Sequence, residues 1–323
     1  MPSEFDLIRR HFSRPTRHTL LAGGDDAALV MPTPGHAQVI STDMLVAGRH
    51  FFADVAPADL GWKCLAVNVS DLAAMGARPR WALLALALPA ADDAWLGAFA
   101  DGFYACADAF DVDLIGGDTT RGPLTVSVTI GGEAPAGTAI RRSGAQPGDE
   151  LWVSGQPGRA ALALWHLRDG AALAPAARAD CLHALHRPQP RLALGLALRG
   201  IARAMLDVSD GLLGDLGHLL DASAVGAQLD AASLPLAALR AAGADARGAQ
   251  RACLSGGDDY ELLFAAPPAQ HAAVRAIGAR LGLPLHCIGR LTPPDAGLTL
   301  IDANGRSTPL ARHGFDHFAP PPA

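Results

Sequence analysis

The sequence predicts an α+β fold of two domains, in which helices are layered on mixed sheets. The chain of 323 residues is longer than the core of one ordinary domain. Apolar runs typical of strands and amphipathic stretches typical of helices follow one another without the strict rhythm of a doubly wound fold. A polar stretch rich in turn residues lies at 137–147. We therefore expect domains at 1–140 and 141–323.

In the first half, the β-branched run 37–45 predicts a strand that ends near Asp43. An apolar stripe predicts a helix over 57–77, and Asn68 and Asp71, three residues apart, share one of its faces. A buried strand is expected at 80–89, an amphipathic helix at 92–110, and two further strands at 112–117 and 124–133. Helices and strands thus mix in one layered domain.

The second half repeats this alternation. A strand is expected near 150, helices from about 158 and around 191–202, a strand at 204–209 that leads into a helix at 210–223, and a strand after 260. The alanine-rich stretches 171–180 and 240–250 are interpreted as linkers. The segment "VSDL" at 69–72 is echoed by "VSDG" at 208–211, which hints at related halves.

Composition and charge exclude several classes of protein. The net charge of -6 and the lack of a basic cluster argue against a nucleic-acid surface. The five cysteines are odd in number and lack a CxxC pair, so we expect buried thiols in a reducing compartment. The first residues do not resemble a signal peptide, and the longest apolar run, 81–91, is too short to span a bilayer. We expect a cytoplasmic protein without membrane contact.

Acidic residues recur at strand ends and beside paired glycines. Gly-Gly-Asp occurs at 23–25, 116–118 and 256–258, and we interpret all three as turns. A single aspartate of this kind is most simply a helix cap or an Asx turn. Many of them beside threonine hydroxyls form a set of hard oxygen ligands that suits Mg²⁺ or Mn²⁺, which would bridge carboxylates to phosphate. The set comprises Asp25, Asp26, Asp43, Asp71, Asp118, Asp207, Asp210, Asp258 and Asp259, with Thr42, Thr119 and Thr120.

The familiar nucleotide-binding motifs are absent from the sequence. The only lysine is Lys63, followed by Cys64, so neither a P-loop nor a kinase-type lysine can be formed. There is no G-x-G-x-x-G after a strand. We interpret Lys63 as a surface lysine rather than a catalytic one. Arg141 and Arg142, at the domain junction, are either a phosphate clamp or a solvated pair.

Eight motifs, in order from about residue 4 to 318, resemble those of the thiamine-monophosphate kinase family. They are "GDDAAL", "STDMLVAGRHF", "AVNVSDLAAMGARP", "LIGGDTTRGPL", "RRSGAQPGD", "DVSDGLLGDLGHL", "LSGGDDYELLF" and "GFDHF". The resemblance implies ATP-dependent phosphorylation of thiamine monophosphate to thiamine diphosphate, with several Mg²⁺ ions. It also implies ATP bound between two α+β domains, and a homodimer joined through the N-terminal domains.

The resemblance also implies roles for individual residues. Those similar to magnesium ligands are Asp26, Ser41, Thr42, Asp43, Asp71, Asp118, Asp207 and Asp210; those similar to ATP contacts are Gly117, Asp118, Arg142 and Ser209; those similar to substrate contacts are His50, Asp258 and Phe315. Asp43, Asp118 and Arg142 are expected to matter most for catalysis. The family often has Glu at the position of Asp258, so this carboxylate is one methylene shorter.

Two alternatives stay open. One is another ATP-using member of the wider superfamily, although a selenophosphate synthetase would be expected to carry a reactive Cys or selenocysteine near its N-terminus. A hydrogenase maturation protein would carry a Cys at its C-terminus. Here the first cysteine is Cys64 and the chain ends in "HFAPPPA". The other alternative is a non-catalytic sensor of nucleotide and magnesium, which the same carboxylates could serve.

Overall fold

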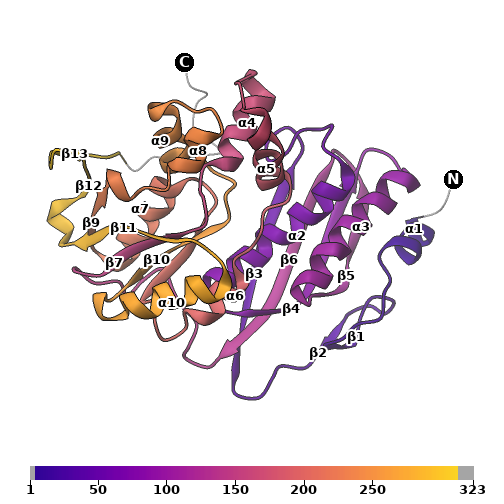
Figure 1. Ribbon diagram of the computed structural model, residues 1–323. Coiled ribbons are helices and arrows are strands. Elements are labelled where there is room, and N and C mark those ends of the chain that lie inside the picture. The colour runs from indigo at the N-terminus through magenta and orange to yellow at the C-terminus, as the bar shows by residue number, and fades with distance from the viewer. Residues whose placement is uncertain (1–3, 312–323) are drawn as a thin grey trace. The chain divides into compact units, whose positions relative to one another are not determined.

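The computed structural model describes residues 4–311, and the chain forms two compact units, Met1–Ala139 and Ile140–Ala323. Both units consist of helices packed against a sheet of mixed strand direction (Figure 1). The α+β fold class expected from the sequence is confirmed. Within residues 4–311, the structure contains no helix with the length and apolarity needed to cross a membrane.

The first unit is built on a four-stranded sheet with the order β3-β6-β4-β5. The β3–β6 and β6–β4 pairs are antiparallel, and β4 and β5 are parallel. The strands are β3 (His36–Val46), β4 (Arg78–Leu88), β5 (Asp113–Arg121) and β6 (Thr125–Pro135). This order places β3 and β5 at opposite edges of the sheet.

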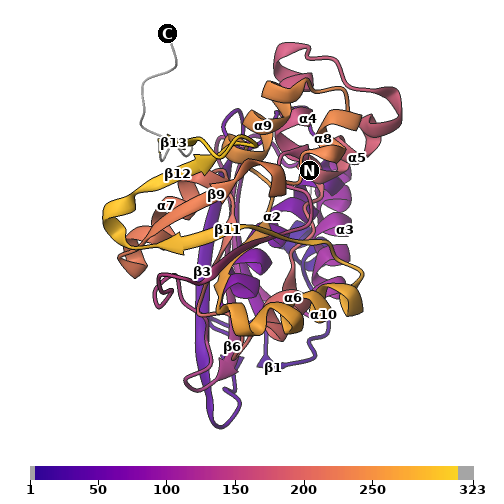
Figure 2. The same ribbon diagram turned by 60° about the vertical axis from the view of Figure 1, so that its left-hand side comes forward.

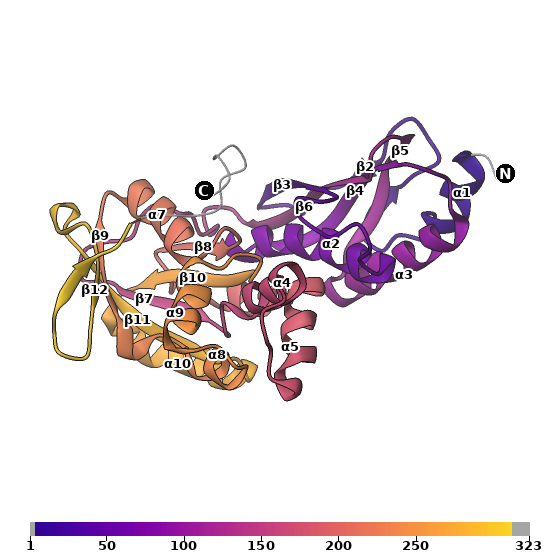
Figure 3. The ribbon, with the colours of Figure 1, turned by 90° about the horizontal axis from the view of Figure 1, so that it is seen from above.

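Helices α2 (Pro57–Ala74) and α3 (Asp93–Phe110) lie side by side across one face of this sheet (Figures 1 and 3). Pro57 favours the start of α2, because its fixed φ suits the first turn. The carboxylate of Asp92 caps α3 by accepting from Ala94 N and Trp95 N. The helices and the sheet enclose Leu60, Leu72, Phe99, Val128 and other apolar residues.

The other face of the four-stranded sheet carries exposed apolar side chains. Ile40 is 61% exposed, Met44 59% and Leu83 37%. Thr42 and Thr129 lie opposite each other on the same face, and Leu83 is paired with Thr129. This set, Ile40, Thr42, Met44, Leu83 and Thr129, is called the open sheet face below.

The N-terminal segment is fastened to β5 by one buried carboxylate. It contains α1 (Glu4–His11), β1 (Thr19–Leu21) and β2 (Leu29–Val30). Asp113 accepts hydrogen bonds from the backbone N–H groups of Arg17 (2.8 Å) and His18 (2.6 Å), and from the hydroxyl of Thr19. These charge-assisted bonds anchor the segment that leads to the first Gly-Gly-Asp turn.

The second unit contains a seven-stranded sheet with the order β13-β12-β9-β11-β7-β10-β8. All neighbouring pairs are antiparallel except β9 and β12, and strands β12, β9 and β11 can be followed in Figure 2. The strands are β7 (Glu150–Ser154), β8 (Ala204–Val208), β9 (Gly226–Asp230), β10 (Glu261–Ala266), β11 (Leu285–Thr292), β12 (Leu298–Ile301) and β13 (Ser307–Pro309).

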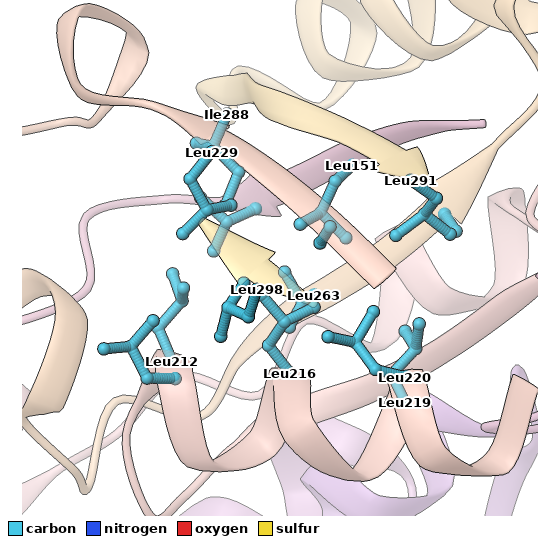
Figure 4. Packing of buried hydrophobic residues seen from close by; sticks show 14 of the residues in the cluster. Leu151, Leu212, Leu216, Leu219, Leu220, Leu229, Leu263, Ile288, Leu291 and Leu298 are labelled. Atoms are coloured by element: carbon cyan, nitrogen blue, oxygen red, sulfur yellow. The ribbon is translucent and has the colours of Figure 1, made fainter. Parts of the chain in front are cut away.

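Helix α7 (Leu212–Ser223) builds the main core of this unit. Its leucines, Leu212, Leu216 and Leu219 among them, pack against strand residues such as Leu263 and Ile288 (Figure 4). The spacing of these leucines places them on one helix face. The other helices are α4 (Arg159–Asp169), α5 (Pro175–His186), α6 (Leu192–Ala197), α8 (Ala237–Ala241), α9 (Ala246–Ser255) and α10 (His271–Leu281), with short 3-10 turns at η1 (Ala231–Ser233), η2 (Pro268–Gln270) and η3 (Pro294–Ala296).

Several expectations from the sequence are wrong. The alanine-rich stretches 171–180 and 240–250 are not linkers, because they contribute to α5, α8 and α9, which pack with α4 around Cys181 and Cys253. Alanine is the strongest helix former, and these helices bury their small side chains. Lys63 is not a surface residue: it is 4% exposed, because α2 is covered by the sheet and by α3. Cys287 is only half-buried, unlike the other four cysteines.

Candidate functional site

In the first unit, β3 and α2 bring a hydroxyl and a carboxylate together. The hydroxyl of Ser41 donates to Oδ2 of Asp71 at 2.5 Å. Side chains alternate along a strand, so Asp43 shares the face of β3 that Ser41 presents to α2. Three of the magnesium ligands implied by the family resemblance therefore lie on the helix-covered side of the sheet.

Thr42 does not belong to this group of side chains. Its hydroxyl lies on the open sheet face, 3.1 Å from the carbonyl of Val128 and 3.0 Å from the hydroxyl of Thr129. Its hydroxyl therefore does not lie beside Ser41 and Asp43, because neighbours on a strand point to opposite faces.

The second Gly-Gly-Asp sequence is not a turn but part of strand β5. Gly117 has a φ of 151°, and a Cβ there would lie 1.8 Å from the carbonyl oxygen of Leu84. Only glycine fits such a close approach to the neighbouring strand. The side chain of Asp118 follows and is exposed.

Asp43 and Asp118 do not lie side by side. They belong to β3 and β5, the two edges of the four-stranded sheet. Three interstrand spacings of about 4.8 Å separate their backbones by roughly 14 Å. The first Gly-Gly-Asp turn lies beside β5, since a Cβ on Gly23 would be 3.8 Å from Cα of Gly116. Asp26 in that turn is exposed, and its N–H donates to the carboxylate of Asp25.

In the second unit, the "VSDG" loop follows edge strand β8 and is held by a residue that the sequence interpretation missed. Oδ2 of Asp215 accepts from Ser209 N and Asp210 N, each at 3.0 Å. Asp215 is 5% exposed, and burial together with the charges of Asp207 and Asp210 raises its pKa to about 7. An aspartate in the first turn of α7, just after the loop, was the available signal.

Replacement of Asp215 by alanine is expected to destabilise the protein by about 1–3 kcal/mol, because two backbone N–H groups lose their acceptor. Turnover is expected to fall as well, since Ser209 and Asp210 lose their support. Asp215→Asn retains an acceptor oxygen and should preserve stability and most of the turnover. Urea unfolding and steady-state kinetics measure both effects. Equal behaviour of the alanine variant and the wild type would contradict the positioning role.

The third Gly-Gly-Asp sequence forms a loop that is hydrogen-bonded to the "VSDG" loop. Asp258 N donates to Ser209 O, and Tyr260 N donates to Val208 O, both at 2.8 Å. A Cβ on Gly257 would lie 2.5 Å from Ser209 O, so the two backbones are in close contact. Asp258 (φ 63°) and Tyr260 (φ 52°) adopt left-handed conformations, and the tyrosine hydroxyl donates to Asp258 at 3.2 Å.

Asp259 points away from Asp258 toward the start of α4. Its carboxyl oxygens accept from Gly158 N at 2.8 and 2.9 Å. Burial raises the pKa of Asp259 well above its usual range, although the hydrogen bond from Gly158 N opposes it. The charges of Glu261 and Asp258 raise this pKa further. The folded state therefore holds a proton on Asp259 at pH values where the unfolded chain, with a pKa near 3.9, has lost it.

Asp259→Asn is expected to raise the thermal stability of the metal-free protein more at pH 8 than at pH 4.5. In the wild type the folded state binds more protons than the unfolded state above pH about 4, so its stability falls as pH rises through the folded pKa of Asp259. Asparagine does not titrate, so the variant does not lose this part of its folding stability as pH rises. Melting curves of both proteins at the two pH values test this. A difference in melting temperature that is independent of pH would contradict it.

The remaining site residues predicted from the sequence are each described within their own unit. The backbone of Arg142 accepts from the hydroxyl of Ser223, and Arg141 O accepts from Met205 N near the start of β8. Ser209 follows the other end of that strand. Nδ1 of His50 accepts from Val46 N at 3.0 Å. Phe315 lies outside the described residues.

Comparisons with known proteins cover nearly the whole chain. Residues 24–134 match the N-terminal domain of AIR synthase related proteins, and residues 146–300 match the C-terminal domain of the same family. The chain is 46% identical to the thiamine-monophosphate kinase of Escherichia coli K12, over 98% of this chain and 99% of that protein.

Solved structures agree with this result. The crystal structure of thiamine-monophosphate kinase from Stenotrophomonas maltophilia is 46% identical, with a TM-score of 0.84 over 94% of this chain and 95% of that one. AaThiL complexed with AMPPCP and TMP is 27% identical, with a TM-score of 0.76 over 89% of each chain. The chain belongs to the thiamine-monophosphate kinase family, within the AIR synthase related proteins.

Proposed function

We propose that this protein catalyses the ATP-dependent phosphorylation of thiamine monophosphate to thiamine diphosphate. The relatives named thiamine-monophosphate kinase, and the structure of AaThiL with AMPPCP and TMP, support this function. The observation that carries it is the hydrogen-bonded pairing of the loop at Ser209 with the loop at Asp258. The first is the proposed nucleotide loop and the second the proposed acceptor loop, so their pairing would hold both substrates in a fixed relation.

The residues present suit magnesium. Within residues 4–311, no three His, Cys, Asp or Glu side chains form a ready metal site. Mg²⁺ fits such a protein, because it takes one or two carboxylates and completes its shell with water and phosphate. The residues proposed to hold such ions are Asp26, Ser41, Thr42, Asp43, Asp71, Asp118, Asp207 and Asp210. Bound there, magnesium would neutralise the charge of the transferring phosphoryl group.

The chain's own residues would bind and orient the two phosphates. The exposed backbone at Gly117 allows an N–H group to approach a phosphate closely, and Ser209 and Arg142 add donors. An oxygen of the acceptor phosphate attacks the γ-phosphorus of ATP in line, and ADP leaves with the electrons of the broken P–O bond. His50, whose Nδ1 already accepts a backbone N–H, keeps its proton on Nε2 when neutral and can donate it to the substrate. We also assign substrate contacts to Asp258 and Phe315.

We further propose that two chains pair through the open sheet face. Ile40, Met44 and Leu83 expose apolar surface there, and such a face is a poor surface for a monomer. In light scattering, the wild type is expected to have twice the mass of one chain, and Met44→Glu the mass of one. Leu167→Glu on α4, where the leucine is 42% exposed, is the matched control and should stay dimeric. A monomeric wild type at micromolar concentration would refute the pairing.

The function itself is tested by incubating the purified protein with ATP, Mg²⁺ and thiamine monophosphate. Thiamine diphosphate and ADP are expected in equal amounts. An Asp210→Asn preparation, purified in parallel, controls for contaminating kinases. Binding of both substrates without any product would instead identify a sensor.

A further inference from the structure

A small pocket in the second unit has no role in the proposed function. Its walls come from the first turn of α4, from α5, from the loop 187–191 and from the start of β10, and its volume is about 80 Å³. Its charged and titratable lining residues are Arg159, Arg187, Arg191 and His183, with the carboxyl groups of Asp180, Asp259 and Glu261. All residues that line the pocket belong to the second unit.

One wall of the pocket is held rigidly. Nε and an Nη nitrogen of Arg191 each donate to an oxygen of Glu261, both at 2.6 Å. The hydroxyl of Ser154 donates to Glu261 at 2.6 Å, and Gln156 N donates to it at 3.3 Å. Glu261 is buried, and its acceptor capacity is used by these four donors. The bidentate pair therefore fixes the Arg191 guanidinium in place.

Arg159 offers a donor that the protein does not use. Its Nε is buried and has no hydrogen-bond partner within residues 4–311. The neighbouring carboxyl of Asp259 accepts from Gly158 N, and its raised pKa makes it a weak counter-charge. A buried unpaired N–H group is unfavourable, so it calls for an acceptor in the pocket.

We propose that this pocket binds a free oxyanion of the phosphate class. Guanidinium groups match the oxygens of such anions in geometry and charge. The volume is well above the 10–15 Å³ or so that one water needs, yet far below the roughly 300 Å³ at which pockets begin to hold organic ligands. The pocket therefore admits inorganic phosphate and excludes a nucleotide or a thiamine ring.

The pocket is lined in part by residues that directly follow Asp258 of the proposed acceptor loop. Asp259 and Glu261 line the pocket. The alternating residues Asp258 and Tyr260 donate backbone hydrogen bonds to the "VSDG" loop. An anion held by Arg159 would also keep the adjacent Asp259 protonated, because repulsion between two negative charges raises its pKa further.

The test is a calorimetric titration of the full-length protein with inorganic phosphate in EDTA, without nucleotide. The chelator removes metal, so the acidic residues of the proposed active site repel phosphate. Saturable binding to the wild type is expected, and Arg159→Met should weaken it at least tenfold. Arg178→Met, an exposed arginine of α5 outside the pocket, is the matched control and should bind as the wild type does. No saturable binding, or equal binding by Arg159→Met, would overturn the proposal.

Two further measurements separate the alternatives. Thiamine monophosphate, titrated under the same conditions, is expected not to displace inorganic phosphate; displacement that is lost in Arg159→Met would show that the pocket takes a phosphate ester. Selenate soaked into crystals should give an anomalous peak near Nε of Arg159, and water alone there would refute the site. If Arg159→Met folds poorly, Arg187→Gln replaces it with the same expected loss. None of these readouts depends on turnover.

Discussion

Asp43→Asn is expected to lower turnover by about 100-fold or more while the protein stays folded. Positioning and charge neutralisation provide most of the catalysis of phosphoryl transfer. Asp43 shares the helix-facing side of β3 with Ser41, whose hydroxyl is bonded to Asp71. Loss of its charge would remove one of the carboxylates that we propose for magnesium. Steady-state kinetics at several Mg²⁺ concentrations measures the effect.

Two variants sharpen this experiment. Asp118→Asn, at the other edge of the sheet, should cause a loss of similar size, because we assign it to the same metal and phosphate cluster. Thr42→Val changes the neighbouring residue of β3, but its hydroxyl is already bonded to the carbonyl of Val128 and to the hydroxyl of Thr129, so turnover should stay within about threefold of the wild type. Near-normal turnover of both aspartate variants at low Mg²⁺ would refute the ligand assignment.

Free thiamine is expected to be phosphorylated at least 1000-fold more slowly than thiamine monophosphate. Its hydroxyl must lose a proton, and a positioned general base is worth roughly 10²- to 10⁴-fold. The one imidazole that we place at the acceptor, His50, accepts a backbone N–H at Nδ1, so its Nε2 carries the proton and is a donor. A phosphate acceptor needs no base, because its second pKa is about 6.

The same mechanism sets the pH dependence and the effect of His50. With thiamine monophosphate the rate should rise from pH 5 to 7, as the acceptor loses its second proton, and then level off. His50→Gln should raise KM more than it lowers kcat, since the imidazole binds but does not take a proton. Efficient turnover of free thiamine, or a phosphorylated side chain trapped in the absence of acceptor, would contradict direct transfer.

The parts of the fold that could be predicted are those with strong periodicity. The expected helix at 57–77 corresponds to α2, and Leu60, Cys64 and Val67 of the predicted stripe are buried in it. The strand at 37–45 corresponds to β3, and alternation along it explains why Ser41 and Asp43 share a face. Local patterns suffice where one face of an element is buried.

The remainder depends on contacts between distant residues. Strands β9 and β12 are short and pair with each other across a long stretch of sequence, so they leave little local pattern. Gly116 and Gly117 favour a turn locally, but both pair with β4 as part of strand β5. Asp215 was missed because its partners are backbone N–H groups, and its place in the first turn of α7 was the only local signal. Arg159 and Glu261 meet their pocket neighbours only in the folded unit.

The backbone bonds between the loops at Ser209 and Asp258 have a consequence for the order of binding. A ligand that settles one loop lowers the conformational entropy that the other must lose when its own ligand arrives. Affinity for the acceptor should therefore rise when nucleotide is bound, and by linkage the acceptor should tighten nucleotide binding by the same factor. Such reciprocity favours a ternary complex over either binary one, so ATP would seldom be held with its γ-phosphate open to hydrolysis while no acceptor is present.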